Sequence, residues 1–192
     1  SKIAYRLVGS QSYFDRREVK DILAFLKVLI NPDDEISLLR IANVPARGLS
    51  AKTMQTLLQL SQDRNTSVWS VMHHSDLDTH LRAAASKSSR AFVSLIEDQR
   101  RFLKEENKMG LTHWARSFLD HIGYFTELKH SEKDPKIAEN RMQSAQELVS
   151  SIDSLTASMG SVKGEDRLSQ FLEEIALDQD RLDEKDKQGE GV

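Results

Sequence analysis

The stretch "DRREVKDILAFLKVLI", residues 15–30, decides the fold of this chain. Its apolar residues recur at spacings of three and four, which predicts a helix with one buried stripe. They are Val19, Ile22, Leu23, Leu26, Leu29 and Ile30. Asp15 is the predicted N-cap, and Glu18 three residues later completes the pattern of a capping box. Asn31-Pro32 ends the helix, because proline disfavours helical geometry in the residue before it.

The same helical period returns along the rest of the chain. Further helices are predicted at approximately residues 34–43, 50–64, 68–72, 83–107, 110–123, 134–159 and 167–178. The chain has only 8 Gly and 3 Pro among 192 residues, which also favours long helices over many short strands. The sequence therefore predicts an all-α fold of seven or eight helices.

Two terminal segments depart from this pattern. "KIAYRLVG", residues 2–9, alternates like a strand, and a single strand leaves its ladder hydrogen bonds unpaired. We expect this orphan strand to pair with something outside the chain or to belong to a neighbouring domain. Residues 179–192 have almost no apolar content and are predicted to form a flexible, acidic tail. The helical unit would then span residues 10–178.

Charge is distributed unevenly along the sequence. The net charge is −3, but the first 60 residues carry nine Lys and Arg against six Asp and Glu, and residues 165–192 carry ten acids against four bases. The excess of basic residues in the N-terminal part is compatible with nucleic acid binding, and equally with a solvated surface that has no partner. Cys is absent, and no apolar run approaches 20 residues, so we expect a soluble, intracellular protein.

Catalytic motifs are hard to find in the sequence. No stretch matches the phosphate-binding pattern G-x-x-x-x-G-K-[ST], and the adjacent His73 and His74 do not have zinc-ligand spacing. Asp120 and His121 are neighbours on a helix and do not face each other, and no Ser or Cys is marked as a nucleophile. We therefore predict no catalytic residue, no metal site and no cofactor within this chain.

One turn carries a candidate binding site. In "NVPARGLSAKTMQTL", residues 43–57, Arg47 precedes a helix that begins near Ser50, and Lys52 lies inside its first turn. Unpaired amides at a helix N-terminus, flanked by cations, bind anions such as phosphate. The alternative is that Pro45 and Gly48 only turn the chain while Ser50 caps the helix. Arg16 and Arg17 form a second basic group at the start of the first long helix.

The first 50 residues closely resemble a segment of bacterial superfamily one DNA helicases of the UvrD, Rep and PcrA type. That segment passes from the second RecA-like domain of these enzymes into an inserted subdomain called 2B. The matching positions are Tyr5, Gly9, Phe14, Arg16, Glu18, Lys20, Asp21, Asn31, Pro32, Asp34, Leu38 or Leu39, Arg40, Ile41, Asn43, Pro45, Arg47 and Gly48. Later stretches such as "HIGYFTEL" and "LSQFLEEIALDQD" also look like 2B helices, and the likeness is weakest from residue 64 to residue 108.

The resemblance implies a role for the chain and a boundary at each end. Residues 1–9 would be the strand and hinge from the RecA-like domain, 10–178 the 2B subdomain, and 179–192 the tail that returns to the RecA-like domain. The parent enzyme would use ATP and magnesium, bound outside this chain, to unwind DNA in the three-prime to five-prime direction. It would work in the bacterial cytoplasm, at the nucleoid, in DNA repair or replication.

The resemblance also implies where DNA is bound. The turn matches the family's GIG motif, which touches the duplex backbone, so it points to Arg47, Gly48, Leu49 and Ser50. Lys52, Arg16 and Arg17 are the further candidates, and the last glycine of the motif is Ser50 here. The expected partners are duplex DNA or a junction of single strand and duplex, the other helicase domains, and repair or replication proteins. The alternative is a protein-interaction or autoinhibitory module of the same helicase.

Overall fold

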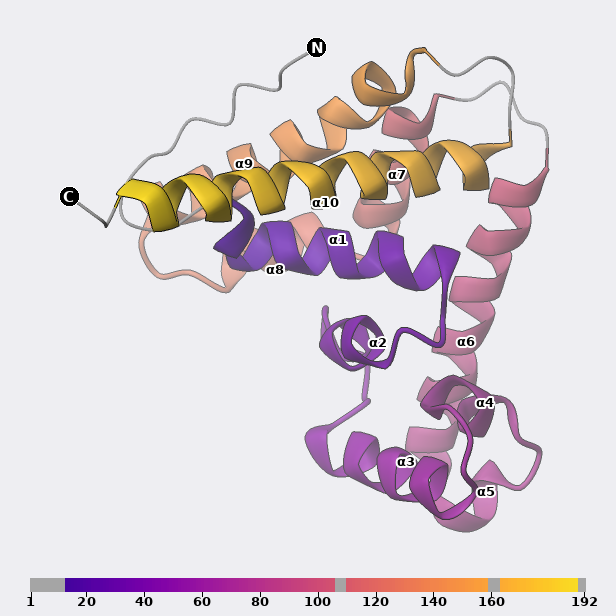
Figure 1. Cartoon of the computed structure of the whole chain (residues 1–192). Helices are drawn as coiled ribbons and strands as arrows, with labels where there is room; N and C mark the ends of the chain where they lie inside the picture. Colours follow the sequence, from indigo (N-terminus) through magenta and orange to yellow (C-terminus); the bar gives the residue numbers. More distant parts are fainter. Residues whose placement is uncertain (1–12, 106–109, 159–162, 190–192) are drawn as a thin grey trace.

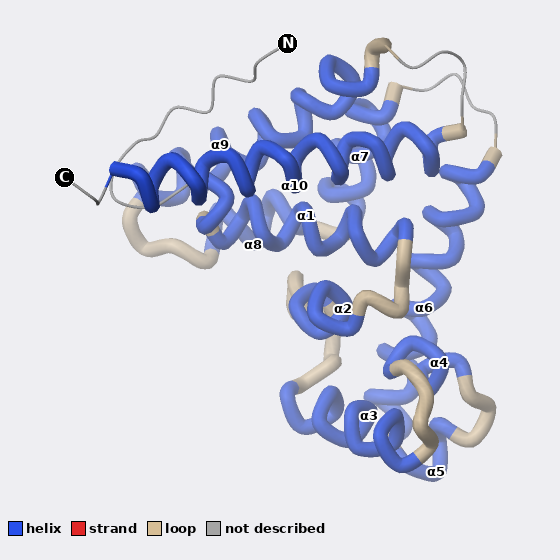
Figure 2. The backbone as a smooth tube through the Cα atoms, viewed as in Figure 1, coloured by secondary structure: helices blue, strands red, loops and turns tan. Residues whose placement is uncertain are grey.

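The computed structural model describes residues 13–105, 110–158 and 163–189, with the backbone alone described from residue 182 to 189. These residues form one short 3₁₀ turn, Tyr13–Asp15, and ten α-helices without any strand (Figure 2). The helices are α1 (Arg17–Ile30), α2 (Glu35–Ile41), α3 (Ala51–Asp63), α4 (Val68–His73), α5 (Leu77–His80), α6 (Ala83–Lys104), α7 (Leu111–His121), α8 (Tyr124–His130), α9 (Pro135–Thr156) and α10 (Gly164–Gly189).

The all-α prediction is confirmed, with more helices than the seven or eight expected. The additional ones are α5 and α8, which have only four and seven residues and therefore show little periodicity. The predicted strand lies outside the described residues. The expected end of the last helix at Asp178 was wrong, because α10 continues to Gly189. Its extension is rich in Asp, Glu, Lys and Gln, and Arg181 pairs with Asp178 one turn away.

Helix α1 forms the centre of the molecule. It packs against α2, α6, α9 and α10, and Figure 1 shows α10 running along it while α6 crosses its end. The predicted stripe of α1 is buried except for Ile30, which is partly buried, and residues on the other sides of the helix are buried as well. Phe25 among these is fully buried and meets Phe118 and Tyr124 edge-to-face. A helix that is apolar on most sides belongs inside a core.

Two carboxylates are buried on this central helix, and each has a basic partner. Asp21 is 2% exposed and lies 2.8 Å from Arg40 of α2, while the hydroxyl of Tyr124 donates to its other oxygen at 3.1 Å. Burial, together with the neighbouring Asp21 carboxylate, raises the pKa of Tyr124 far above its ordinary value, so the hydroxyl remains a donor. Glu18 faces Arg141 of α9 at 3.9 Å. The predicted capping box is absent, because Arg16 takes the N-cap position without a side-chain bond.

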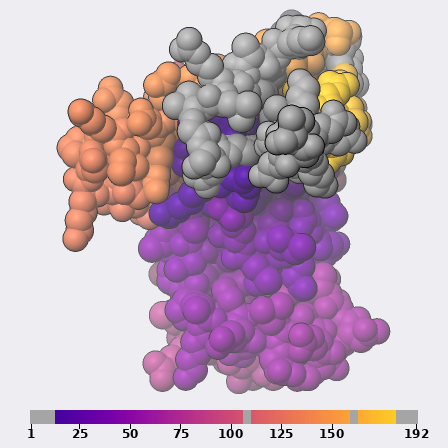
Figure 3. Space-filling model, turned by 60° about the vertical axis from the view of Figure 1, so that its left-hand side comes forward, coloured from indigo at the N-terminus to yellow at the C-terminus, as the bar shows by residue number. Residues whose placement is uncertain are grey.

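Helices α3, α4 and α5 form a second group that is joined to the α1 bundle by α2 and α6. In Figure 1 this group lies at the lower end, and α6 runs up one side from it to the bundle. In the space-filling view of Figure 3, the purple and magenta residues of this half form one block, and the orange residues project sideways above it. Trp69 and Trp114 are buried in the core. Among the described residues, no helix has the length and apolarity to span a membrane.

The start of α7 depends on a residue that is distant in the sequence. Its N-cap, Gly110, has no side chain to accept the first amides, and Asp153 of α9 takes over this role. The Asp153 carboxylate accepts from the amides of Leu111 at 2.9 Å and Thr112 at 3.2 Å, and Arg167 of α10 donates to it at 2.9 Å. One carboxylate therefore holds α7, α9 and α10 together.

We predict that Asp153→Ala lowers the free energy of unfolding by about 1–2 kcal/mol, the usual value of a helix cap. Urea unfolding followed by circular dichroism measures this. The control is Asp98→Ala, which removes only an exposed pair with Arg101 and should change stability by less than about 0.5 kcal/mol. Equal effects of the two substitutions would contradict the assigned role.

Candidate nucleic-acid interface

The segment between α2 and α3, which we call turn 43–50, is organised by a single side chain. The Oδ1 atom of Asn43 accepts from the backbone amide of Arg47 at 2.9 Å and from that of Leu49 at 3.1 Å. The Val44–Pro45 peptide bond within the turn is cis. Leu49 is fully buried and anchors the end of the turn in the core. Asparagine is suited to this position because its short amide side chain reaches nearby backbone groups.

Arg47 turns inward rather than toward solvent. Its guanidinium group donates to the carbonyl oxygens of Pro45 and Val44, in its own turn, and lies 5.1 Å from the ring centre of Phe92 on α6. Burial lowers the pKa of Arg47 to about 10, so the group stays protonated at neutral pH. Arg47 thus closes the turn onto α6.

Gly48 and Ser50 shape the surface of the turn. Gly48 is exposed and has a φ of +85°, a conformation that favours glycine. A Cβ added there would lie 2.6 Å from the Oγ atom of Ser88. The hydroxyl of Ser50 accepts from the amide of Thr53 at 3.3 Å and so caps α3. The turn and the Ser50 cap predicted from the sequence are both present.

The amides of Ala51 and Lys52 at the start of α3 have no acceptor within the part of the chain that the structure describes. The helix dipole adds a partial positive charge there, and Lys52 is exposed. Lys87 on α6 is a second exposed cation beside Arg47, and neither lysine is paired with an acidic side chain among the described residues. Sequence reasoning missed Lys87 and Ser88, because a lysine and a serine on an outer helix face carry no signal of their own.

Arg16 and Arg17 are held by partners within the chain. Arg16 donates to the hydroxyl of Ser144 at 2.5 Å and lies over the ring of Tyr13. Arg17 is 42% exposed and lies 3.6 Å from Asp21 and 3.8 Å from Glu127. The structure therefore gathers five of the seven predicted residues, Arg47 to Ser50 and Lys52, around the start of α3, and places Arg16 and Arg17 on a separate element.

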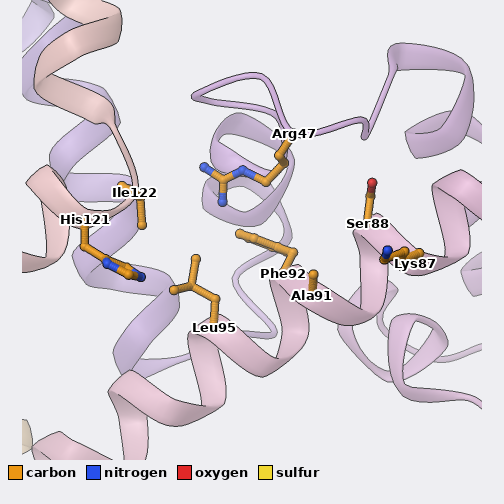
Figure 4. Close-up of a pocket in the computed structure, with 8 residues that line it drawn as sticks. All are labelled: Arg47, Lys87, Ser88, Ala91, Phe92, Leu95, His121 and Ile122. Atoms are coloured by element: carbon orange, nitrogen blue, oxygen red, sulfur yellow. The ribbon is translucent and has the colours of Figure 1, made fainter.

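A cavity of about 420 Å³ lies behind turn 43–50 (Figure 4). Arg47 reaches it from the turn, Phe92 and Leu95 from α6, and Ile122 from the end of α7. Among the described residues, the cavity lining included, no group of three or more His, Asp or Glu side chains is arranged to hold a metal ion.

The whole chain, residues 1–192, matches the model of the UvrD-like helicase C-terminal domain. The chain belongs to this family. It is 31% identical over 190 residues to the ATP-dependent DNA helicase PcrA of Bacillus subtilis (strain 168), which covers 97% of this chain and 24% of that protein.

Two further relatives are helicases of the Rep type. The ATP-dependent DNA helicase Rep of Salmonella typhimurium is 32% identical over 150 residues, or 78% of this chain and 22% of its own length. Rep of Buchnera aphidicola is 40% identical over 96 residues, covering 50% of this chain and 14% of its own length. The chain thus spans about a quarter of the length of PcrA and of the Salmonella Rep protein. The expected membership of the UvrD, Rep and PcrA type is confirmed.

We predict that Asn43→Ala lowers the free energy of unfolding by about 1–3 kcal/mol, because two amides of turn 43–50 lose their acceptor. Asn43→Asp retains an acceptor and should lose less. Thermal or urea unfolding measures both variants, and Asn31→Ala is the control because its side chain accepts from one exposed amide only, that of Asp33. An Asn43→Ala variant as stable as the parent chain would show that Asn43 does not organise the turn.

Proposed function

We propose that this chain is the 2B accessory subdomain of an ATP-dependent DNA helicase. It contacts the backbone of duplex DNA through turn 43–50 and the start of α3, and in this way modulates unwinding by the parent enzyme. The observation that carries the proposal is the exposed Gly48 turn, which leads directly into the unpaired amides of Ala51 and Lys52. Membership of the UvrD-like family and the names of the relatives, all DNA helicases, support it.

The contacts in this proposal differ in kind from residue to residue. The amides of Ala51 and Lys52 and the Lys52 ammonium group bind a phosphate, which carries no sequence information. Gly48 lets the DNA backbone approach closely, and Leu49 and Arg47 hold the turn in shape from within. Arg16 and Arg17 contribute to DNA binding only if they release their partners within the chain and bind phosphates instead.

The parent enzyme supplies the remainder of the activity. We propose that ATP and magnesium bind to its other domains, that this chain alone hydrolyses no ATP, and that the enzyme moves in the three-prime to five-prime direction. The same proposal places it in the bacterial cytoplasm, at the nucleoid, where it serves DNA repair or replication. Binding by the isolated chain is weak, with a Kd of about 10⁻⁴ M, because few phosphates are contacted.

Fluorescence anisotropy of a labelled DNA hairpin with a single-stranded tail tests the phosphate contact. We predict that Lys52→Gln weakens binding and lowers the slope of log K against log salt by about 1, since one phosphate contact is lost. The control is Lys129→Gln, which removes an exposed lysine from α8. Binding that does not depend on salt, or that responds equally to the two substitutions, would contradict the proposal.

A second pair of variants in the same assay separates the turn from general stability. Gly48→Ala and Gly123→Ala each place a side chain at a positive φ, +85° and +78°, which is expected to cost about 1–2 kcal/mol of stability. Gly48→Ala must in addition displace the Ser88 hydroxyl, 2.6 Å from the new Cβ, whereas the new Cβ at Gly123 has no neighbour within 4 Å. Only Gly48→Ala should also weaken DNA binding.

A further inference from the structure

The cavity behind turn 43–50 has a chemical character that phosphate binding does not explain. Its volume of about 420 Å³ falls within the range of small ligand sites. Figure 4 shows the Arg47 side chain passing over Phe92 toward Ile122, with Leu95 below them. The walls facing this space are therefore mainly apolar, and they come from three separate segments of the chain.

The ionisable side chains around the cavity are all basic. Arg47, Lys87 and His121 line it, and its lining contains no Asp or Glu. Lys87 and His121 are exposed at the two sides, while Arg47 lies deeper. A ligand with both a negative charge and an apolar part would complement this arrangement.

Arg47 also has unused hydrogen-bonding capacity. Its Nε and Nη2 atoms donate to carbonyl oxygens of turn 43–50, but its Nη1 atom is buried and has no partner among the described residues. A buried donor on a charged group is costly unless it is paired. A carboxylate that enters the cavity would bring a counter-charge close to this guanidinium group, which forms no ion pair among the described residues.

We propose that this cavity docks a peptide segment of a protein partner in which Asp or Glu neighbours a leucine or an aromatic residue. The carboxylate pairs with the basic groups, and the apolar side chain packs on Phe92, Leu95 and Ile122. A DNA phosphate would satisfy the charge but would leave the apolar walls unfilled. The proposal does not require DNA binding at the start of α3, since all the lining residues except Arg47 come from α6 and the end of α7.

Methyl NMR of the 192-residue chain tests the proposal without DNA. The probes are two acetylated and amidated tetrapeptides, Glu-Leu-Phe-Gly and Lys-Leu-Phe-Gly. We predict that the acidic peptide shifts the methyl signals of Leu95 and Ile122 saturably, and that the basic peptide binds more weakly. Lys87→Gln should weaken the acidic peptide about threefold, the effect of one exposed ion pair, and leave the basic peptide unchanged.

Filling the cavity gives a matched pair of variants. Ala91 lines the cavity and is exposed on α6, so Ala91→Phe should fill the space without disturbing the core and abolish the shifts. Ser94→Phe adds the same ring to an exposed position of α6 outside the lining and should leave binding intact. Equal binding of the two peptides, the absence of shifts, or shifts that persist in Ala91→Phe would overturn the proposal. So would a DNA duplex that shifts these methyl groups when the acidic peptide does not.

Discussion

The ion pair between Asp21 and Arg40 is the contact on which the candidate interface depends. Helix α1 is surrounded by other helices, and Asp21 on this helix is buried in the protein core, with 2% of its surface exposed. A buried carboxylate needs cationic partners, and Arg40 at 2.8 Å is nearer to Asp21 than Arg17 at 3.6 Å. Because Arg40 belongs to the last turn of α2, the pair ties the end of α2, and with it the start of turn 43–50, to α1.

Beyond α2, a series of contacts fixes the shape and position of turn 43–50. Asn43 holds two amides of the turn, Leu49 fills a place in the core, and Arg47 reaches across to Phe92 of α6. Turn 43–50, which leads into α3, is thereby held against α6, the long helix that joins the two halves of the molecule. A binding group positioned by rigid elements retains its geometry, which reduces the entropy lost when a ligand binds.

Local periodicity was sufficient to predict the long helices and the all-α class. The apolar spacing in α1 and the Ser50 cap were both visible in the sequence, and both are present. Features that depend on distant residues were not predictable in this way. The cap of α7 comes from Asp153, about 40 residues later, and the predicted cap Asp15 instead pairs with Lys20.

The candidate site shows the same limit. The sequence indicated a turn followed by a helix N-terminus, and the structure has both. That Arg47 folds inward could not be read from the sequence, because it depends on Phe92, which follows it by 45 positions and lies on another helix. Lys87 and Ser88 reach the turn only through the packing of α6, so no local pattern marked them.

The most direct test of the account is an amide NMR titration of this chain with a short DNA duplex at low salt. The account predicts that the largest shifts occur at Gly48, Ser50, Ala51 and Lys52, and that these shifts diminish as salt is added. Shifts concentrated on another surface, or none in this turn at saturating duplex, would contradict the claim that the start of α3 is the DNA-binding surface.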